Sequence, residues 1–194
     1  DAMNIICITN RKLCQQDFLI RLEEIAKAGP KAIVLREKDL SEDEYMSLAS
    51  DVMNIGERYN VPVYLHYFYD VAKKLGANCI HLPLWKLDEE GFSLSDFSDV
   101  GVSCHSIEDA KKAAEYGCSY IFAGHIFDTD CKRGLPGRGL SFLKNVCDSI
   151  DIPVYAIGGI NSENAREALR HGASGVCIMS GLMQCENVWQ YMDS

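Results

Sequence analysis

Histidines are the residues of this sequence best suited to chemistry near neutral pH. His66, His105 and His125 each follow a short apolar segment, His81 lies near the end of another, and His171 ends an amphipathic segment. An imidazole can take up and release a proton near neutrality, and its neutral form also ligates metals. The four histidines at segment ends therefore predict either proton transfer or a metal centre.

Proton transfer is the interpretation we favour. Metal sites of barrel enzymes usually combine histidines with carboxylates, and no Asp or Glu is clearly placed with these histidines. We therefore predict no metal ligand and no cofactor. His81, inside an apolar segment, is expected to be structural, and His171 is expected to be a surface or capping residue.

Two glycine-containing turns predict a phosphate site. Ile157-Gly158-Gly159-Ile160 follows one apolar segment, and Met179-Ser180-Gly181 follows the last one and is expected to open the last helix. Glycine lets the backbone approach a ligand closely, and free N–H groups at a helix start attract anions. Tight turns that bind no ligand remain the alternative. The predicted contacts are Gly158, Gly159, Met179, Ser180 and Gly181.

Basic side chains in neighbouring loops add to this prediction. The loop cations are Arg36, Lys38, Lys86, Lys132, Arg133 and Arg138. Any one of them alone is typical of a solvated loop, but several on one rim indicate an anionic substrate. Arg36, Lys38 and Lys132 belong to the predicted binding set, together with the hydroxyl residues Ser103 and Thr129.

The elements that must position these residues alternate along the whole chain. Short apolar runs rich in β-branched residues predict eight strands, at residues 4–9, 32–35, 61–65, 79–82, 100–103, 120–123, 154–157 and 175–179. Amphipathic segments lie between them. Strands that alternate with helices give a parallel sheet with the helices outside.

Capping residues predict where three of the helices begin, and a glycine predicts where one of them ends. Ser41 with Glu44 predicts a capping box, and Ser106 with Asp109 predicts a similar start. Asn161 or Ser162 is expected to cap a third helix that ends at Gly172. In the fourth unit, residues 84–97 resemble a loop with a broken turn more than a helix.

These elements predict a single-domain (β/α)8 TIM barrel with short helices and loops. An open doubly wound sheet is the alternative, but eight units can be counted and no G-x-G-x-x-G follows the first strand. The 194 residues are few for such a barrel, which typically has about 250. Asp1-Ala2 precede Met3 as an expected remnant of cloning, so the predicted domain spans residues 3–194.

Composition narrows the classes of partner. A net charge of −9 argues against nucleic acid or an anionic membrane surface, although a small anion needs only a local positive site. Nine cysteines without a C-x-x-C pair, mostly in apolar runs, suit a reducing compartment, so a cytoplasmic protein is expected. No stretch is long enough to span a membrane. A homo-oligomer is left open.

Several short motifs follow the order and spacing of one family. They are Ile8-Thr9, Leu35-Arg36-Glu37-Lys38, Ile80-His81-Leu82, Ser103-Cys104-His105-Ser106, Ala156-Ile157-Gly158-Gly159-Ile160 and Met179-Ser180-Gly181. Through them nearly the whole chain resembles the thiamine-phosphate synthase superfamily. The resemblance implies a TIM barrel that binds a small phosphorylated molecule.

The resemblance fails where a synthase holds Mg²⁺. A synthase joins a pyrimidine diphosphate to a thiazole phosphate, and its Asn-Asp pair falls on His66-Tyr67 while a second Asp falls on Lys86. Magnesium prefers carboxylate oxygens, and here it would meet an imidazole, a phenol and an ammonium group.

The sixth loop, residues 124–139, resembles the TenI-type thiazole tautomerases of the same superfamily. Synthases usually carry proline where His125 stands. The resemblance implies isomerisation of a carboxythiazole phosphate to its aromatic tautomer, with His125 as proton shuttle and phosphate contacts at Gly159, Met179 and Ser180. A thiamine-phosphate synthase and a non-catalytic or regulatory thiazole-phosphate-binding protein remain alternatives.

Overall fold

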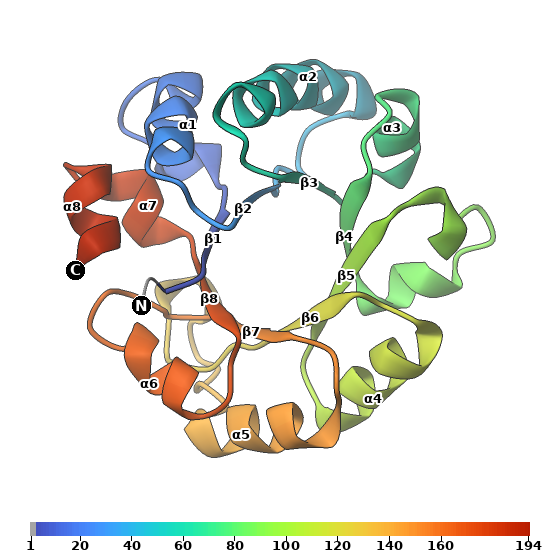
Figure 1. Cartoon of the computed structure of the whole chain (residues 1–194), viewed down its shortest axis with the longest axis vertical. Coiled ribbons are helices and arrows are strands. Elements are labelled where there is room, and N and C mark those ends of the chain that lie inside the picture. Colours follow the sequence, from blue (N-terminus) through green and yellow to red (C-terminus); the bar gives the residue numbers. More distant parts are fainter. Residues whose placement is uncertain (1–2) are drawn as a thin grey trace.

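Eight parallel strands pair in chain order and close into a barrel, because β1 pairs with both β2 and β8 (Figure 1). The computed structural model describes residues 3–194, so Asp1 and Ala2 lie outside the described residues. The strands are β1 (Ile5–Ile8), β2 (Ala32–Leu35), β3 (Val63–His66), β4 (Cys79–Pro83), β5 (Asp99–Cys104), β6 (Tyr120–Ala123), β7 (Val154–Ala156) and β8 (Gly175–Ile178). The predicted (β/α)8 fold is confirmed.

The strands lie where the apolar runs predict them, with small differences at their ends. β2 and β6 have their predicted bounds, and the others differ by one or two residues at an end. The largest difference is at β3, which begins at Val63 rather than Val61. Val61 donates its N–H to Gly56 O at the end of the preceding helix, and Pro62 has no N–H to donate to the sheet.

Short helices outside the barrel explain how the fold fits this chain. The helices are α1 (Phe18–Lys27), α2 (Glu42–Tyr59), α3 (Tyr69–Lys74), α4 (Ile107–Tyr116), α5 (Leu140–Ser149), α6 (Ala165–Arg170), α7 (Ser180–Gln184) and α8 (Val188–Asp193), with 3-10 turns η1 (Arg11–Leu13), η2 (Leu84–Asp88), η3 (Leu94–Asp96) and η4 (Asp130–Lys132). The fourth unit holds only η2 and η3, as predicted. Within residues 3–194, none of the helices has the length and apolar character needed to cross a bilayer.

Two predicted helix boundaries are wrong. The segment that opens at Ser180 is not the last helix, because α7 ends at Gln184 and α8 follows it. The helix α6 begins at Ala165, since the Asn161 carboxamide accepts from the N–H groups of Glu163 and Asn164 and holds a turn instead of capping the helix.

The other predicted helix ends agree with the structure. Ser41 and Glu44 form the predicted capping box at α2, and the Ser106 hydroxyl accepts from Asp109 N at the start of α4. Gly172 lies just after α6 with φ +103°, a backbone conformation that favours glycine.

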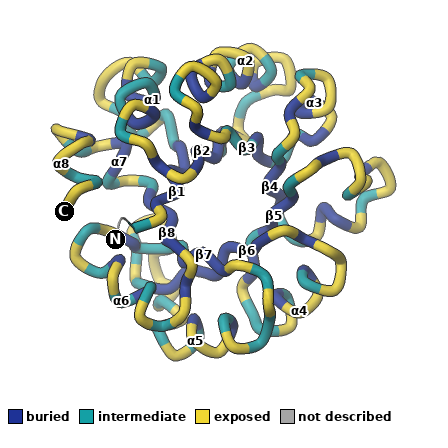
Figure 2. Tube along the Cα trace, in the orientation of Figure 1, coloured by how far each residue is buried: buried dark blue, intermediate teal, exposed yellow. Residues whose placement is uncertain are grey.

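Burial follows the two sides of the strands. One large apolar cluster lies between the strands and the helices, and the outer faces of the helices are exposed (Figure 2). A second cluster fills the barrel lumen with Ile6, Val34, Tyr120, Phe122 and Tyr155 among its members. The alternation of side chains along each strand produces these two layers.

One glycine makes room for the largest of the lumenal rings. A Cβ atom added at Gly101 on β5 would lie 1.9 Å from Cζ of Tyr120 on β6. The Tyr120 ring therefore occupies the space that a larger residue at position 101 would need, and the aromatic packing of the lumen depends on this glycine.

Replacing Gly101 with alanine should destabilise the barrel. Overpacking a well-filled core typically costs about 1–3 kcal/mol, and we expect a loss of this size in the free energy of unfolding measured with urea. Gly91→Ala is the matched control, because its added Cβ would come no closer than 3.3 Å to Tyr69 Oη. A Gly101→Ala variant as stable as the control would contradict this account of the lumen.

Candidate active site

The loop after β6 folds back onto the turn after β7. Ile126 N donates to Ile157 O at 2.9 Å, and Phe127 N donates to Gly158 O at 3.0 Å. This extra pairing continues beyond the end of both strands. It fixes the backbone directly after His125, which is 9% exposed.

The ring of His125 is held through one nitrogen. Its Nε2 lies 3.0 Å from Leu135 O. A carbonyl can only accept, so Nε2 carries the proton of the neutral imidazole and Nδ1 is left unprotonated. The bond from Arg138 N to His125 O, 2.9 Å long, closes the loop around this residue. The arrangement leaves one nitrogen of His125 able to accept a proton.

The two glycines predicted to approach a phosphate have close partners within the protein. A Cβ at Gly158 would lie 2.2 Å from Cβ of His125, and one at Gly159 would lie 2.7 Å from Asp128 O. Both have positive φ, of +102° and +68°. Their small size therefore admits the His125 loop, and a phosphate contact at either glycine stays a prediction.

The predicted contacts after β8 lie in a compact corner. Met179 packs against the lumenal cluster, and Ser180 is exposed at the first position of α7. Gly181 faces α8, because an added Cβ would lie 1.9 Å from Tyr191 Oη. Ser180 is thus the residue of this turn whose side chain is open to a ligand.

Three of the predicted cations converge on one part of the rim. Burial lowers the pKa of Lys38, and the positive charges of Arg36 and Lys132 lower it further. Within residues 3–194, none of these three side chains forms an ion pair. Unneutralised cations near one another favour an anion. The predicted residue Thr129 has a local task, since its hydroxyl accepts from Cys131 N at the start of η4.

The remaining loop cations either have a partner within the protein or are exposed in the loop. Lys86 pairs with Glu89 at 3.3 Å, and Arg138 Nε donates to Gly124 O at 2.9 Å. Arg133 is exposed in the loop. The group of loop cations without ion pairs is therefore smaller than the basic rim that the sequence predicts.

A buried carboxylate that the sequence reasoning missed holds this rim in place. Glu37 is 2% exposed and accepts from the Thr9 hydroxyl at 2.7 Å and from Arg11 Nη1 at 2.9 Å. Thr9 Oγ1 in turn accepts from Arg36 N. Arg11 also binds Asp39 and holds the pKa of that carboxyl far below its usual range. Two sequence features could have indicated this network. Thr9 is a polar residue directly after β1, and Glu37 is an acid between two cations.

The other histidines have distinct surroundings. His81 is buried as expected, with both ring nitrogens hydrogen-bonded, whereas the buried Nδ1 of His66 has no partner. His105 is exposed, and its Nδ1 lies 3.2 Å from Gly124 O. His171 Nδ1 lies 2.7 Å from Glu167 O, which fits the predicted capping role.

The residues at the family's magnesium positions do not fit that ion. The Lys86 ammonium lies 4.0 Å from the centroid of the Tyr67 ring and pairs with Glu89, which also accepts from Tyr69 Oη. His66 offers a neutral imidazole. Across residues 3–194, no three His, Cys, Asp or Glu side chains are grouped as a metal site would need. A hard cation would find no free carboxylate at these positions.

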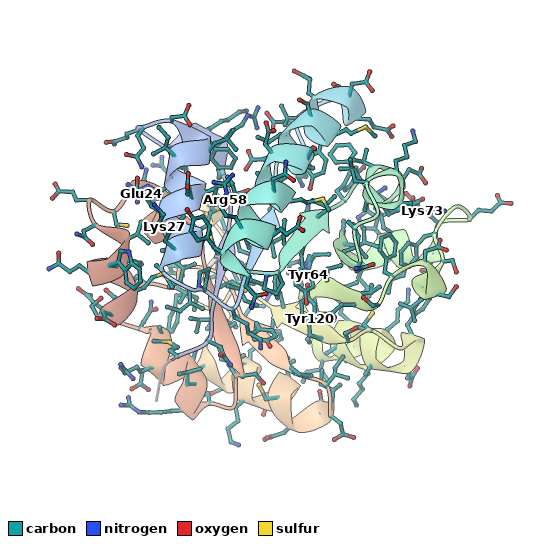
Figure 3. All side chains as sticks on the ribbon, turned by 45° about the horizontal axis from the view of Figure 1, so that its top comes forward. Glu24, Lys27, Arg58, Tyr64, Lys73 and Tyr120 are labelled. Carbon is teal, nitrogen blue, oxygen red and sulfur yellow. The ribbon has the colours of Figure 1, made fainter. Side chains whose placement is uncertain are left out.

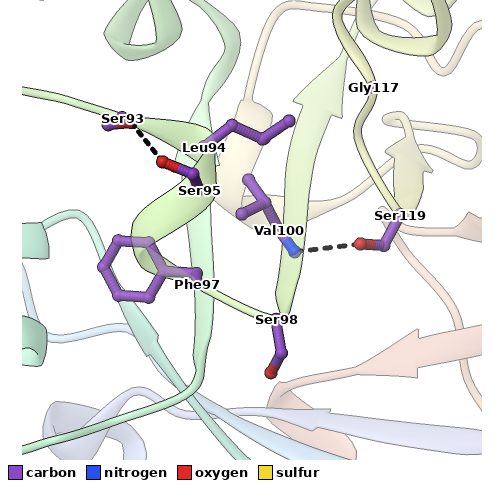
Figure 4. A pocket seen from close by; sticks show the side chains of 8 residues that line it. All are labelled: Ser93, Leu94, Ser95, Phe97, Ser98, Val100, Gly117 and Ser119. Atoms are coloured by element: carbon purple, nitrogen blue, oxygen red, sulfur yellow. Dashed lines mark hydrogen bonds between the residues drawn. The ribbon is translucent and has the colours of Figure 1, made fainter.

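One hollow lies away from these residues. It has a volume of about 520 Å³ and is lined by serines and apolar residues around η3, β5 and the start of β6, among them Ser93, Ser95 and Ser119 (Figure 4). None of its lining residues is charged. Active sites of this fold lie at the opposite, C-terminal ends of the strands, so we do not assign this hollow a catalytic role.

Burial of His66 predicts a pH-dependent stability. Desolvation and the charges of Arg36 and Lys38 lower its pKa to about 3 from 6.5, so acid protonates this group in the unfolded chain before the folded one. Stability present above pH 6.5 is lost as pH falls towards 3. From 6.5 to 5 the loss should be on the order of 2 kcal/mol. In urea unfolding, we expect the free energy of unfolding of His66→Asn to change less between pH 6.5 and 5 than that of the wild type. An unchanged pH dependence would contradict this account of His66.

Comparisons with known proteins identify the family of this chain. The family model described as thiamine monophosphate synthase matches residues 5–182. Thiamine-phosphate synthase of Clostridium acetobutylicum is 34% identical over 93% of this chain and 87% of its own, and putative thiamine-phosphate synthase 2 of Aquifex aeolicus is 34% identical over 93% and 97%. The structure of thiamine phosphate pyrophosphorylase from Pyrococcus furiosus superposes with a TM-score of 0.84 at 28% identity, covering 98% and 92%. The chain therefore belongs to the thiamine-phosphate synthase family.

Proposed function

We propose that this member of the family is a thiazole tautomerase, which isomerises a carboxythiazole phosphate to its aromatic tautomer in thiamine biosynthesis. One observation carries the proposal. His125 offers an unprotonated Nδ1 beside the strand ends, while His66, Tyr67 and Lys86 stand where a synthase needs ligands for Mg²⁺. The site is thus equipped for proton transfer and poorly equipped for a metal diphosphate.

The chemistry requires one base that acts twice. Nδ1 of His125 removes a proton from a ring carbon, and the electron pair left behind delocalises over the ring. The resulting imidazolium returns the proton to a carbon outside the ring, which restores the neutral imidazole and leaves the ring aromatic. No atom is gained or lost, so no co-reactant is needed.

The substrate would be bound through its negatively charged groups. The phosphate is expected at the turns after β7 and β8, with Ser180 and the backbone near Gly159 as contacts. Arg36, Lys38 and Lys132 form the unneutralised cationic part of the rim and suit a second negative group such as the carboxylate. Two anchored ends would fix the ring relative to His125, which lowers the barrier by orientation.

A thiamine-phosphate synthase is the second candidate. The names of the curated relatives favour it, since they are called thiamine-phosphate synthases. That activity would join two substrates and depend on Mg²⁺. A protein that only binds the thiazole phosphate is a further alternative.

One assay separates the three. The purified protein is incubated with the non-aromatic thiazole phosphate, with and without EDTA, and the ring signals are followed by NMR. We expect aromatisation that EDTA does not change. Product formation only with the pyrimidine diphosphate and Mg²⁺ would favour the synthase, and binding without turnover would favour the non-catalytic protein.

The variant His125→Asn should lose turnover and keep binding. Asparagine is polar and of modest size but cannot serve as the base, and general acid–base groups contribute about 10²–10⁴-fold in rate. We expect kcat to fall by about this factor, with the Kd for the thiazole phosphate nearly unchanged by calorimetry.

His105→Asn is the matched control, because His105 is exposed and its ring Nδ1 lies 3.2 Å from the carbonyl of Gly124, the residue before His125. It should cost much less than His125→Asn. Near wild-type turnover in His125→Asn, with loss in the His105 variant, would mean that the wrong histidine has been chosen.

A further inference from the structure

A fully buried histidine links the inside of the barrel to its catalytic face. His81 on β4 is 1% exposed, and its ring stacks on Phe122 with centroids 4.1 Å apart. Its Nδ1 lies 2.9 Å from Tyr120 Oη, and its Nε2 lies 2.9 Å from Ser103 Oγ. Ser103 is half-buried near the C-terminal end of β5, the end at which the His125 loop lies.

The buried phenol fixes the direction of these hydrogen bonds. Within residues 3–194, the hydroxyl of Tyr120 has no side-chain or backbone partner except His81. If Tyr120 accepted a hydrogen bond from His81, its own O–H would be left buried without an acceptor, which is unfavourable. Tyr120 therefore donates to Nδ1. Burial lowers the pKa of His81, so the ring stays neutral and carries its single proton on Nε2.

The same reasoning extends to the serine. Nε2 of His81 donates to Ser103 Oγ, so the hydroxyl proton of Ser103 must point elsewhere. Among the described residues no acceptor for it is present. The unused donor lies at the catalytic end of β5, where a substrate with negative groups would offer an acceptor.

Resting on the proposed function, we infer that Tyr120 and His81 are positioning residues that hold the Ser103 hydroxyl as a hydrogen-bond donor to the substrate. Tyr120 and Tyr64 lie together inside the barrel (Figure 3), with ring centroids 5.6 Å apart, and the Tyr64 hydroxyl donates to Asp99. Within residues 3–194, Tyr120 makes no hydrogen bond to Asp99, and the partner of its hydroxyl is the ring of His81.

The tautomer of His81 is the first test. In ¹⁵N-histidine-labelled, ligand-free protein, long-range ¹H–¹⁵N NMR spectra distinguish a protonated from an unprotonated ring nitrogen. With His81 assigned by its absence from the spectrum of His81→Asn, we expect protonated Nε2 and unprotonated Nδ1. The reverse tautomer would overturn the inference. This measurement needs no turnover, so it stands apart from the proposed activity.

The second test is a double-mutant cycle on tautomerase turnover. Tyr120→Phe keeps the ring but removes the donor to Nδ1, so His81 should populate both tautomers. The loss of one typical hydrogen bond predicts a fall of roughly two- to tenfold in kcat/KM. In a Ser103→Ala background the same change should have no further effect. Additive losses would show that Tyr120 acts by another route.

Tyr155→Phe is the matched control. Tyr155 lies in the same part of the lumen, its ring centroid 5.7 Å from that of Tyr120, and no hydrogen bond to its hydroxyl is present in the described part of the chain. It should leave both the His81 tautomer and kcat/KM unchanged. If it lowers kcat/KM as much as Tyr120→Phe, packing of the lumen explains the loss. If the wild type shows no turnover, the proposed function fails, and the tautomer alone decides between the two orientations of the relay.

Discussion

The contact of the His125 backbone with Gly158 is the constraint on which the rest of the site depends. The loop after β6 can rest on the turn after β7 only because Gly158 has no side chain, since a Cβ there would lie 2.2 Å from Cβ of His125. The hydrogen bonds of Ile126 and Phe127 to this turn then extend the barrel beyond its strands. A histidine carried by a long loop is thereby held as precisely as a residue at a strand end.

The rim carries unpaired positive charge although the molecule as a whole is negatively charged. The chain carries a net charge of −9, yet Arg36, Lys38 and Lys132 remain without ion pairs among the described residues. The buried carboxylate of Glu37 does not neutralise them, because Thr9 and Arg11 occupy it. Glu37 instead fixes the backbone between two of these cations, which is why an acid lies among positively charged residues of the rim.

The lumen contributes polarity as well as packing. Tyr120, His81 and Ser103 form a hydrogen-bonded row from the interior to the C-terminal end of β5, while Gly101 provides the space for the first of them. Buried polar networks restrict the orientation of their members. The row therefore fixes side-chain orientations inside the barrel as well as filling its interior.

The sequence by itself determined the eight strands, the capping box at Ser41 and the position of His125 after β6, because hydrophobic period and end signals are local properties. Only the tertiary structure decided what the glycines and the buried polar groups contact. Gly158 lies against His125, and neither this contact, nor the Glu37 network, nor the link from His81 to Tyr120 is visible in a linear pattern. Their partners are 28 and 39 residues away in the chain, and only the packing of the strands in the folded barrel brings them within hydrogen-bonding distance.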